Sequence, residues 1–106
     1  MSEMNKQDME NLTLLAINYA LEEDSSTRES RERILTAEFA EENAMSEPKE
    51  YKILLHRFQK EGVIEGILFH GPTNKPDKCV LFEKGTIKVT PYGKGLVEKY
   101  DRKYFK

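Results

Sequence analysis

The chain has 106 residues, of which 38% are hydrophobic and 34% are charged. A chain of this length can build one modest core, so we expect residues 1–106 to form a single domain. No apolar stretch approaches the roughly 18 residues of a membrane-spanning helix, and the first residues lack the basic and apolar regions of a signal peptide. We therefore expect no membrane partner. The single cysteine, Cys79, excludes an internal disulfide and fits a reducing compartment, so we expect a cytoplasmic protein.

The net charge of −2 hides an asymmetry between the two halves of the chain. Residues 1–50 carry 13 acidic and 5 basic side chains, a net charge of −8, and residues 51–106 carry 6 acidic and 12 basic side chains, a net charge of +6. This asymmetry favours a polyanion-binding face in the C-terminal half. It is equally compatible with attraction between the two halves, within one fold or across a dimer.

The first predicted element is a long helix from about Gln7 to Glu23. One set of apolar residues keeps helical spacing and forms a stripe: Met9, Leu12, Ala16, Tyr19 and Ala20. A second set broadens this stripe: Leu14, Leu15, Ile17 and Leu21. An apolar surface this broad predicts a helix that is buried on more than one side, in a central position or at a dimer seam.

The polar segment from Glu22 to Arg33 follows. It contains Ser26-Thr-Arg-Glu29, a capping-box pattern that is typical of the start of a helix, and a solvated loop is the alternative. The apolar pair Ile34-Leu35 is long enough only for a minimal strand.

A short second helix is predicted over Ala37 to about Glu42, with Thr36 as its cap and with Phe39 and Ala40 facing inward. We expect a turn at Asn43-Ala-Met45, and then Ser46 as the N-cap of the next helix.

The third helix is predicted over about Glu47 to Glu61. Tyr51, Leu54, Leu55 and Phe58 are spaced as one apolar stripe, and Gly62 supplies the left-handed residue that commonly ends a helix. The composition then changes to that of a strand, from about Val63 to Phe69.

The rest of the chain predicts a hairpin and a final helix. His70 to Lys78 contains one glycine and two prolines and is predicted as the hairpin tip. Cys79-Val-Leu-Phe82 and Ile87-Lys-Val-Thr90 are strand segments separated by a turn or bulge at Glu83-Lys-Gly85. Thr90 and Pro91 then begin the last helix as its N-cap and first residue.

This order of elements predicts an α+β fold of the winged helix-turn-helix type, with a three-helix core, a small β-hairpin wing and a C-terminal helix. Because an isolated two-stranded hairpin is only marginally stable, we expect Ile34-Leu35 to add a third strand.

Three segments carry a resemblance to a known family. They are Leu14-Leu-Ala-Ile-Asn-Tyr-Ala-Leu21, Phe58-Gln-Lys-Glu-Gly-Val-Ile-Glu-Gly66 and Ile87-Lys-Val-Thr-Pro-Tyr-Gly-Lys-Gly-Leu96. With these segments the chain resembles the YjcQ-like family, small phage-associated winged-helix proteins of Gram-positive bacteria. The resemblance implies a winged helix and a phage or prophage context, and it brings no catalytic residues. The acidic segment from Glu22 to Glu32 and the extended wing tip depart from the compact family pattern.

The third helix is the candidate recognition helix. The face opposite its apolar stripe carries Lys49, Lys52, His56, Gln59 and Lys60. Lysine and glutamine reach phosphates and base edges, and helix-turn-helix proteins place such a face in the major groove of DNA. The acidic Glu47 and Glu50 near the helix start oppose this interpretation, and a solvated helix face is the alternative.

The wing tip is the second candidate. Its polar residues are of types that contact phosphates or a minor groove; they are His70, Thr73, Asn74, Lys75 and Lys78. A loop without a partner is the alternative.

The residue pattern gives little support for a metal site or a catalytic site. His56, His70 and Cys79 have no metal-ligand spacing, and Cys79 is expected to be packed. We therefore expect no metal, no cofactor and no enzymatic activity. The aromatic C-terminal end either closes the core over the first helix or forms a homodimer seam through the region of Leu14, Tyr100 and Tyr104.

Two functional hypotheses follow. The first is a DNA-binding protein of phage or prophage origin, such as a transcriptional regulator, that contacts double-stranded DNA through the third helix and the wing lysines. The alternative is a winged helix used as a protein-interaction module that binds no nucleic acid. The acidic first half and the broad apolar first helix favour the alternative.

Overall fold

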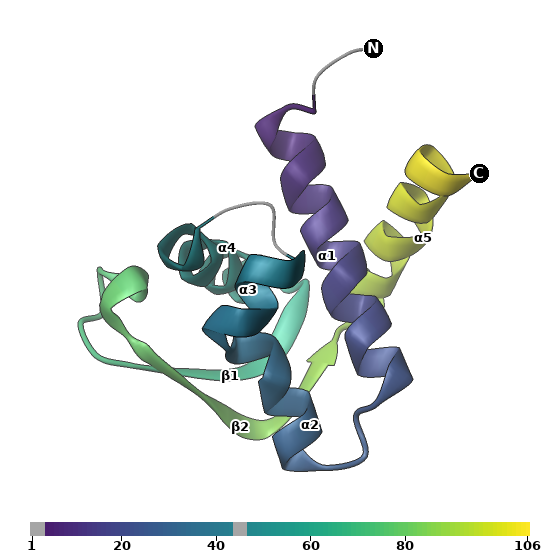
Figure 1. The fold of residues 1–106 in the computed structure, drawn as a ribbon. Coiled ribbons are helices and arrows are strands. Elements are labelled where there is room, and N and C mark those ends of the chain that lie inside the picture. Colours follow the sequence, from purple (N-terminus) through teal and green to yellow (C-terminus); the bar gives the residue numbers. More distant parts are fainter. Residues whose placement is uncertain (1–3, 44–46) are drawn as a thin grey trace.

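The computed structural model describes residues 4–43 and 47–106. The elements follow one another as α1 (Lys6–Glu23), α2 (Arg28–Glu32), the 3-10 helix η1 (Arg33–Leu35), α3 (Ala37–Asn43), α4 (Pro48–Lys60), β1 (Ile64–His70), the 3-10 helix η2 (Pro76–Lys78), β2 (Val80–Val89) and α5 (Pro91–Phe105). The fold is α+β, since the two strands form an antiparallel hairpin against the helices (Figure 1). The radius of gyration of 13.3 Å is that of a compact chain of this length.

The hydrophobic core lies where α1, α3, α4 and the hairpin meet. The predicted stripe of α4 is fully buried and contributes Tyr51, Leu54, Leu55 and Phe58. Leu14 and Ile17 of α1 pack against this stripe at 1% and 0% exposure. The Tyr51 hydroxyl donates a 2.6 Å hydrogen bond to the carbonyl oxygen of Ile34, so the one polar atom of this ring is satisfied inside the core.

The switch from helix to strand at Gly62 is confirmed. Gly62 has a φ of +78°, which is in the left-handed region. Its N–H donates to the carbonyl of Gln59 at 3.1 Å, and the Val63 N–H donates to the carbonyl of Phe58 at 2.8 Å. These two bonds satisfy carbonyl groups at the end of α4 and turn the chain directly into β1.

The predicted start of the last helix is also confirmed. The Thr90 hydroxyl accepts a hydrogen bond from the Gly93 N–H at 3.0 Å, and Pro91 is the first residue of α5. Gly93 packs against the backbone of Val63, and a Cβ atom there would lie 2.2 Å from the Val63 carbonyl oxygen. The starts of α5 and β1 are therefore held against each other.

The predicted third strand at Ile34-Leu35 is wrong. These residues belong to η1, and the described sheet has two strands. Thr36 explains the difference, because its N–H and its hydroxyl both donate to the carbonyl of Arg33, at 3.2 and 2.7 Å, and close a tight turn. The same hydroxyl accepts from the Phe39 N–H and caps α3, as predicted.

The polar segment before η1 forms a short helix rather than a loop. The capping box of α2 lies one residue later than the sequence pattern indicated, with Thr27 as N-cap and Ser30 as its partner. The predicted turn continues as helix through Asn43, and its remaining residues 44–45 lie outside the described residues, as does the predicted cap Ser46. Glu47 takes the N-cap position of α4 without a side-chain hydrogen bond.

The hairpin carries a bulge where a turn or bulge was predicted. Glu65 pairs with Lys88 and Ile67 pairs with Glu83, so Gly66 lies opposite the extra residues of β2. Gly66 has a φ of +95°, and a Cβ atom there would lie 2.2 Å from the Thr86 carbonyl oxygen. Only glycine fits at this contact without a shift of the backbone.

The helix α1 buries a different face from the one predicted by the spacing of Leu12, Ala16 and Tyr19. Its buried residues are Asn11, Thr13, Leu14, Ile17, Asn18, Ala20 and Leu21. Tyr19 is 68% exposed, and Leu12 and Ala16 are half-buried. In the described structure the second apolar side of α1 is therefore only partly covered.

Candidate functional site

Three of the predicted residues on α4 contact the hairpin. The Lys52 ammonium donates a 2.9 Å hydrogen bond to the carbonyl of Cys79. The His56 ring lies edge-on to the Phe69 ring, with 5.1 Å between the centroids. The Gln59 amide donates to the carbonyl of Ile67 and accepts from the Ile67 N–H, each at 2.8 Å. This side of α4 is therefore the surface on which the hairpin is docked.

These contacts determine which of the candidate residues still have polar groups available to bind a partner. The Gln59 amide binds the backbone of β1 with both its N–H and its carbonyl group, so it is not presented to a base edge. The Lys52 ammonium has three N–H donors and uses one on the Cys79 carbonyl. Lys49 and Lys60 are exposed to solvent at opposite ends of α4.

The hairpin tip, which carries Lys75 and Lys78, lies beside α4 (Figure 1). Residues Pro76–Lys78 form η2, and its end is joined to α4 by the bond from Lys52 to Cys79. Lys75 and Lys78 are exposed on this turn. The structure thus places Lys52 beside the turn that carries Lys75 and Lys78, whereas Lys60 lies at the far end of the helix.

None of the ion pairs within the described residues involves a lysine of α4 or of the hairpin tip. The basic residues that have an acidic partner within 4.0 Å are Arg28, Arg31, Arg57, Lys88, Lys94, Lys103 and Lys106. None of the five candidate lysines is among them. We use the name basic face for the surface of α4 and η2 that carries Lys49, Lys52, Lys60, Lys75 and Lys78.

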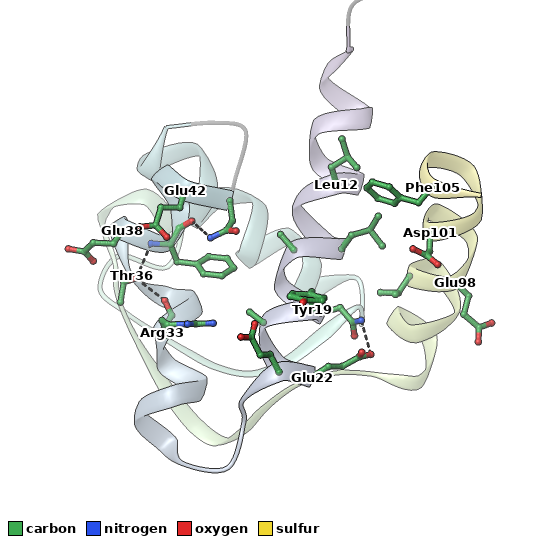
Figure 2. Close-up of a pocket in the computed structure, with 18 residues that line it drawn as sticks. Leu12, Tyr19, Glu22, Arg33, Thr36, Glu38, Glu42, Glu98, Asp101 and Phe105 are labelled. Carbon is green, nitrogen blue, oxygen red and sulfur yellow. Dashed lines mark hydrogen bonds between the residues drawn. The ribbon is translucent and has the colours of Figure 1, made fainter.

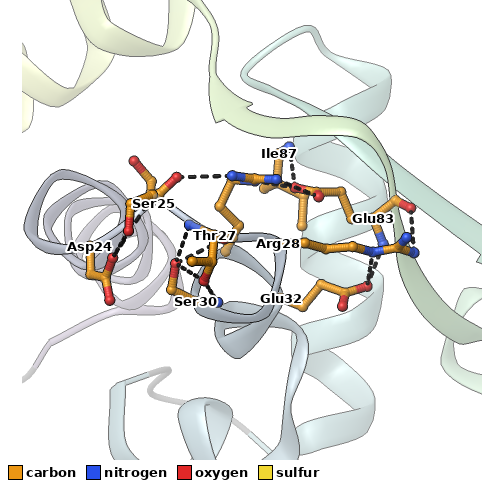
Figure 3. A network of polar contacts seen from close by, with 10 residues as sticks. Asp24, Ser25, Thr27, Arg28, Ser30, Glu32, Glu83 and Ile87 are labelled. Atoms are coloured by element: carbon orange, nitrogen blue, oxygen red, sulfur yellow. Dashed lines mark hydrogen bonds and ion pairs between the residues drawn. The ribbon is translucent and has the colours of Figure 1, made fainter.

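A polar network holds the other side of the hairpin (Figure 3). The buried Glu83 carboxylate of β2 binds the Arg31 guanidinium through two hydrogen bonds, and it accepts a third from the Ile87 N–H at 3.0 Å across the bulge. The hydrogen bonds from Arg31 hold the pKa of the Glu83 carboxyl below its usual range.

Each strand of the hairpin has an outer edge, and at one cross-strand pair helix side chains form hydrogen bonds to the backbone groups on both outer edges. Ile67 and Glu83 face each other across the two strands. Gln59 binds both backbone polar groups of Ile67, as described above. On the other edge, the Glu83 N–H donates to the Glu32 carboxylate at 2.9 Å, and Arg28 donates to the Glu83 carbonyl at 3.4 Å. Helices α4 and α2 therefore hold the hairpin from its two sides.

The Glu83 network was not predicted from the sequence. A usable signal was present, because strand alternation places Glu83 on the same face as Leu81, and a glutamate at an inward position requires a partner. The identity of that partner could not be read, since Arg31 lies 52 residues earlier in the chain.

A second surface lies on the other side of the molecule, between α1, α3 and α5. It is an open groove of about 980 Å³ (Figure 2). Its floor is the half-covered side of α1, and exposed carboxylates of α3 and α5 stand on its two sides. No prediction from the sequence identified this groove.

The remaining candidate residues lie in ordinary surroundings. Cys79 is buried, and its thiol contacts the carbonyl oxygens of Pro72 and Lys75 inside the hairpin tip. Leu14 is 1% exposed in the core of the chain, and the Tyr104 hydroxyl binds Asp8 and Asn11 of α1. The residues of the predicted dimer seam therefore pack α5 on α1 within one chain.

None of the helices in residues 4–43 and 47–106 combines the length and the apolar character that crossing a bilayer requires. Comparisons of the chain with protein-family models, with curated proteins and with solved structures found no match.

Proposed function

We propose that the chain is a winged helix-turn-helix protein that binds double-stranded DNA through the basic face. In this assignment α1, α3 and α4 form the three-helix core, the hairpin β1–β2 is the wing and α5 is the C-terminal helix. The observation that carries the proposal is the joining of α4 to η2, which gathers Lys49, Lys52, Lys75 and Lys78 on one surface without acidic partners among the described residues.

The geometry favours contacts to phosphates over contacts to bases. Lysine ammonium groups bind phosphate oxygens as point charges, and such contacts position a protein on a duplex without reading its sequence. Gln59, the residue best suited to an adenine edge, is occupied by β1. We therefore expect affinity that depends strongly on salt and only weakly on base sequence.

The hairpin contacts give this surface its rigidity. The bonds from Lys52 to Cys79 and from Gln59 to Ile67 fix the wing to the helix, so the lysines of both elements move as one unit. A preformed surface avoids the entropy cost of ordering the wing when a duplex binds.

A titration of a fluorescent random duplex at several salt concentrations tests the proposal. With about four phosphate contacts, the logarithm of the association constant should fall with the logarithm of salt concentration at a slope near −3 to −4. The double variant Lys75→Ala/Lys78→Ala should reduce the magnitude of this slope by about 2.

The matched control is Lys99→Ala/Arg102→Ala, which removes the same charge from exposed positions of α5. This control variant should change the slope of the salt dependence only slightly. No binding at low salt, or equal losses in the two double variants, would refute a role for the basic face.

The alternative is a protein-interaction module without nucleic-acid binding. The observation that favours it is the use of Lys52, His56 and Gln59 in docking the hairpin, which leaves few free groups on the candidate recognition helix. Failure of the duplex titration would select this alternative. The phage or prophage context and the cytoplasmic location belong to the proposal through the YjcQ-like resemblance and the single cysteine.

A further inference from the structure

The long helix α1 has a second apolar side that the fold does not cover. Leu12, Leu15 and Ala16 are half-buried on this side, and Tyr19 is 68% exposed among them. From Leu12 to Tyr19 this side extends over about 10 Å of helix. Across the groove, Phe105 of α5 is 67% exposed. Leu12, Leu15, Ala16 and Tyr19 are spaced as i, i+3, i+4 and i+7, so they form one strip along the helix.

Acidic side chains surround this strip. Figure 2 shows Glu38 and Glu42 on the side of α3, Glu98 and Asp101 on the side of α5, and Tyr19 between them. Among the residues that line the groove, the carboxylates are Glu22, Glu23, Glu38, Glu42, Glu98 and Asp101, and the one basic residue is Arg33.

Most of these carboxylates are free to bind a cation. In the described structure, Glu22 pairs with Lys94 and Asp101 pairs with Lys106. The other four carboxylates have no basic partner within 4.0 Å among the described residues. The groove therefore joins an apolar floor to a rim with an excess of negative charge.

We infer that this groove binds a basic amphipathic helix of a partner protein. A helix of this type would place its apolar stripe on the floor formed by α1, with lysine or arginine side chains on its flanks facing Glu38 and Glu42 on one side and Glu98 on the other. Binding of an amphipathic helix in an apolar groove is a common mode of peptide recognition. Complementary charges at the rim would set the orientation and the rate of association.

Other occupants fit the groove less well. Nucleic acid is repelled by the carboxylates. A second copy of this chain fits less well. The apolar sides of its α4 and α5 are already used, since Tyr51 and Leu55 of α4 are buried and Leu96 and Tyr100 of α5 pack against the core. Its uncovered α1 side would bring a second acidic rim against the first. The inference is independent of the proposed binding of DNA, since the groove and the basic face share no residue.

The test uses a labelled 18-residue helical peptide with leucine at positions i, i+3, i+4 and i+7 and with lysine on both flanks. Its affinity for the full chain is measured by fluorescence anisotropy. A second peptide has the same leucines and glutamate on its flanks. We expect binding of the lysine peptide that weakens with salt, and at least tenfold weaker binding of the glutamate peptide.

Two variants with matched controls locate the site. Glu38→Gln/Glu42→Gln removes two rim charges and should weaken binding of the lysine peptide three- to tenfold. The control Glu41→Gln changes an exposed glutamate of the same helix that does not line the groove. Tyr19→Ser should weaken binding at least tenfold, whereas Tyr92→Ser, which changes a tyrosine that is 61% exposed outside the groove, should have no effect.

Three results would overturn the inference. The first is equal affinity for the lysine and glutamate peptides, and the second is unchanged affinity of the groove variants. The third is a concentration-dependent dimer in sedimentation experiments that Tyr19→Ser dissociates, because it would assign the groove to a second copy. Duplex binding by Glu38→Gln/Glu42→Gln should match that of the unmodified chain, so this result separates a failure of the groove from a failure of the basic face.

Discussion

Gly66 is the residue at which the shape of the hairpin is decided. Its backbone lies close to the backbone of Thr86, and residues other than glycine rarely adopt its positive φ. The motif Gly62-Val-Ile-Glu-Gly66 therefore combines two requirements: Gly62 ends α4, and Gly66 accommodates the bulge of β2.

Replacing Gly66 by alanine should be strongly destabilising. The added Cβ atom would require a backbone shift and a left-handed alanine, which together should lower the free energy of unfolding by about 2 kcal/mol or more. The control is Gly95→Ala, because Gly95 lies in α5 with nothing within 4 Å of its added Cβ atom. That change should raise stability by about 0.5–1 kcal/mol, and urea unfolding measures both. Equal effects of the two changes would contradict this account of the bulge.

Glu83 makes stability depend on pH. The pKa of its carboxyl is held below the ordinary value near 4.5 by the hydrogen bonds from Arg31, so the folded state favours the ionised form. The stabilising contribution is therefore present above the ordinary pKa and is lost as the pH falls through the lowered one. Glu83→Gln should cost about 1–3 kcal/mol at pH 7, because the hydrogen bonds to a charged group are weakened.

The pH series provides the check. Between pH 7 and pH 3 the difference in unfolding free energy between the unmodified chain and Glu83→Gln should shrink. The exposed Glu29 of α2 is the control position, and Glu29→Gln should change the free energy of unfolding at pH 7 by less than about 0.5 kcal/mol. A difference for Glu83→Gln that stays constant with pH would show that the ionised carboxylate contributes nothing.

At the scale of elements, the hairpin depends on the helices that close its two edges. A two-stranded hairpin alone is marginally stable in water. Here α4 binds the edge of β1 through Gln59, and α2 binds the edge of β2 through Glu32 and Arg28. These side chains take the place of the third strand that the sequence led us to expect.

The variant Gln59→Leu tests this role. It keeps the size of the side chain and leaves the N–H and the carbonyl of Ile67 without their partner, so stability should fall by about 2 kcal/mol. Hydrogen exchange of the Ile67 amide should become faster than that of the other β1 amides. Lys60→Met, at the exposed neighbouring position, should change stability by less than about 0.5 kcal/mol. Unchanged exchange at Ile67 would contradict the docking role of Gln59.

Local signals in the sequence predicted most of the elements. The stripe on α4, the left-handed Gly62 and the Thr90-Pro91 helix start each depend on residues close together in the chain, and the structure confirms all three. The prediction for Ile34-Leu35 was wrong because Thr36 closes a turn there and because the buried Tyr51 hydroxyl takes the Ile34 carbonyl.

The surfaces were harder to predict because they depend on contacts between distant residues. Spacing alone placed Lys52, His56 and Gln59 on one face of the third helix, but it could not show that the hairpin docks on that face. The apolar width of α1 was visible in the sequence. Which side the core would leave uncovered depended on how α3 and α5 pack, and this could not be read from the spacing.

At the scale of the whole molecule, basic and acidic side chains gather on separate surfaces, which follow the two halves of the sequence only in part, since Lys49 comes from the acidic half and Glu98 and Asp101 come from the basic half. The basic face is built from α4 and η2, whereas the carboxylates of the groove come from α1, α3 and α5. The proposed functions of the two surfaces are separate, so a protein that binds DNA on one face could hold a basic partner helix on the other.

The most direct test of the central claim is a map of the duplex contact by nuclear magnetic resonance. A short random duplex is added to the isotope-labelled chain at low salt, and the shifts of the backbone amides are followed. We expect the largest changes at Lys49, Lys52, Lys75 and Lys78, with the amides of α3 unchanged. Changes confined to α1, α3 and α5, or no changes at any duplex concentration, would contradict binding of DNA through the basic face.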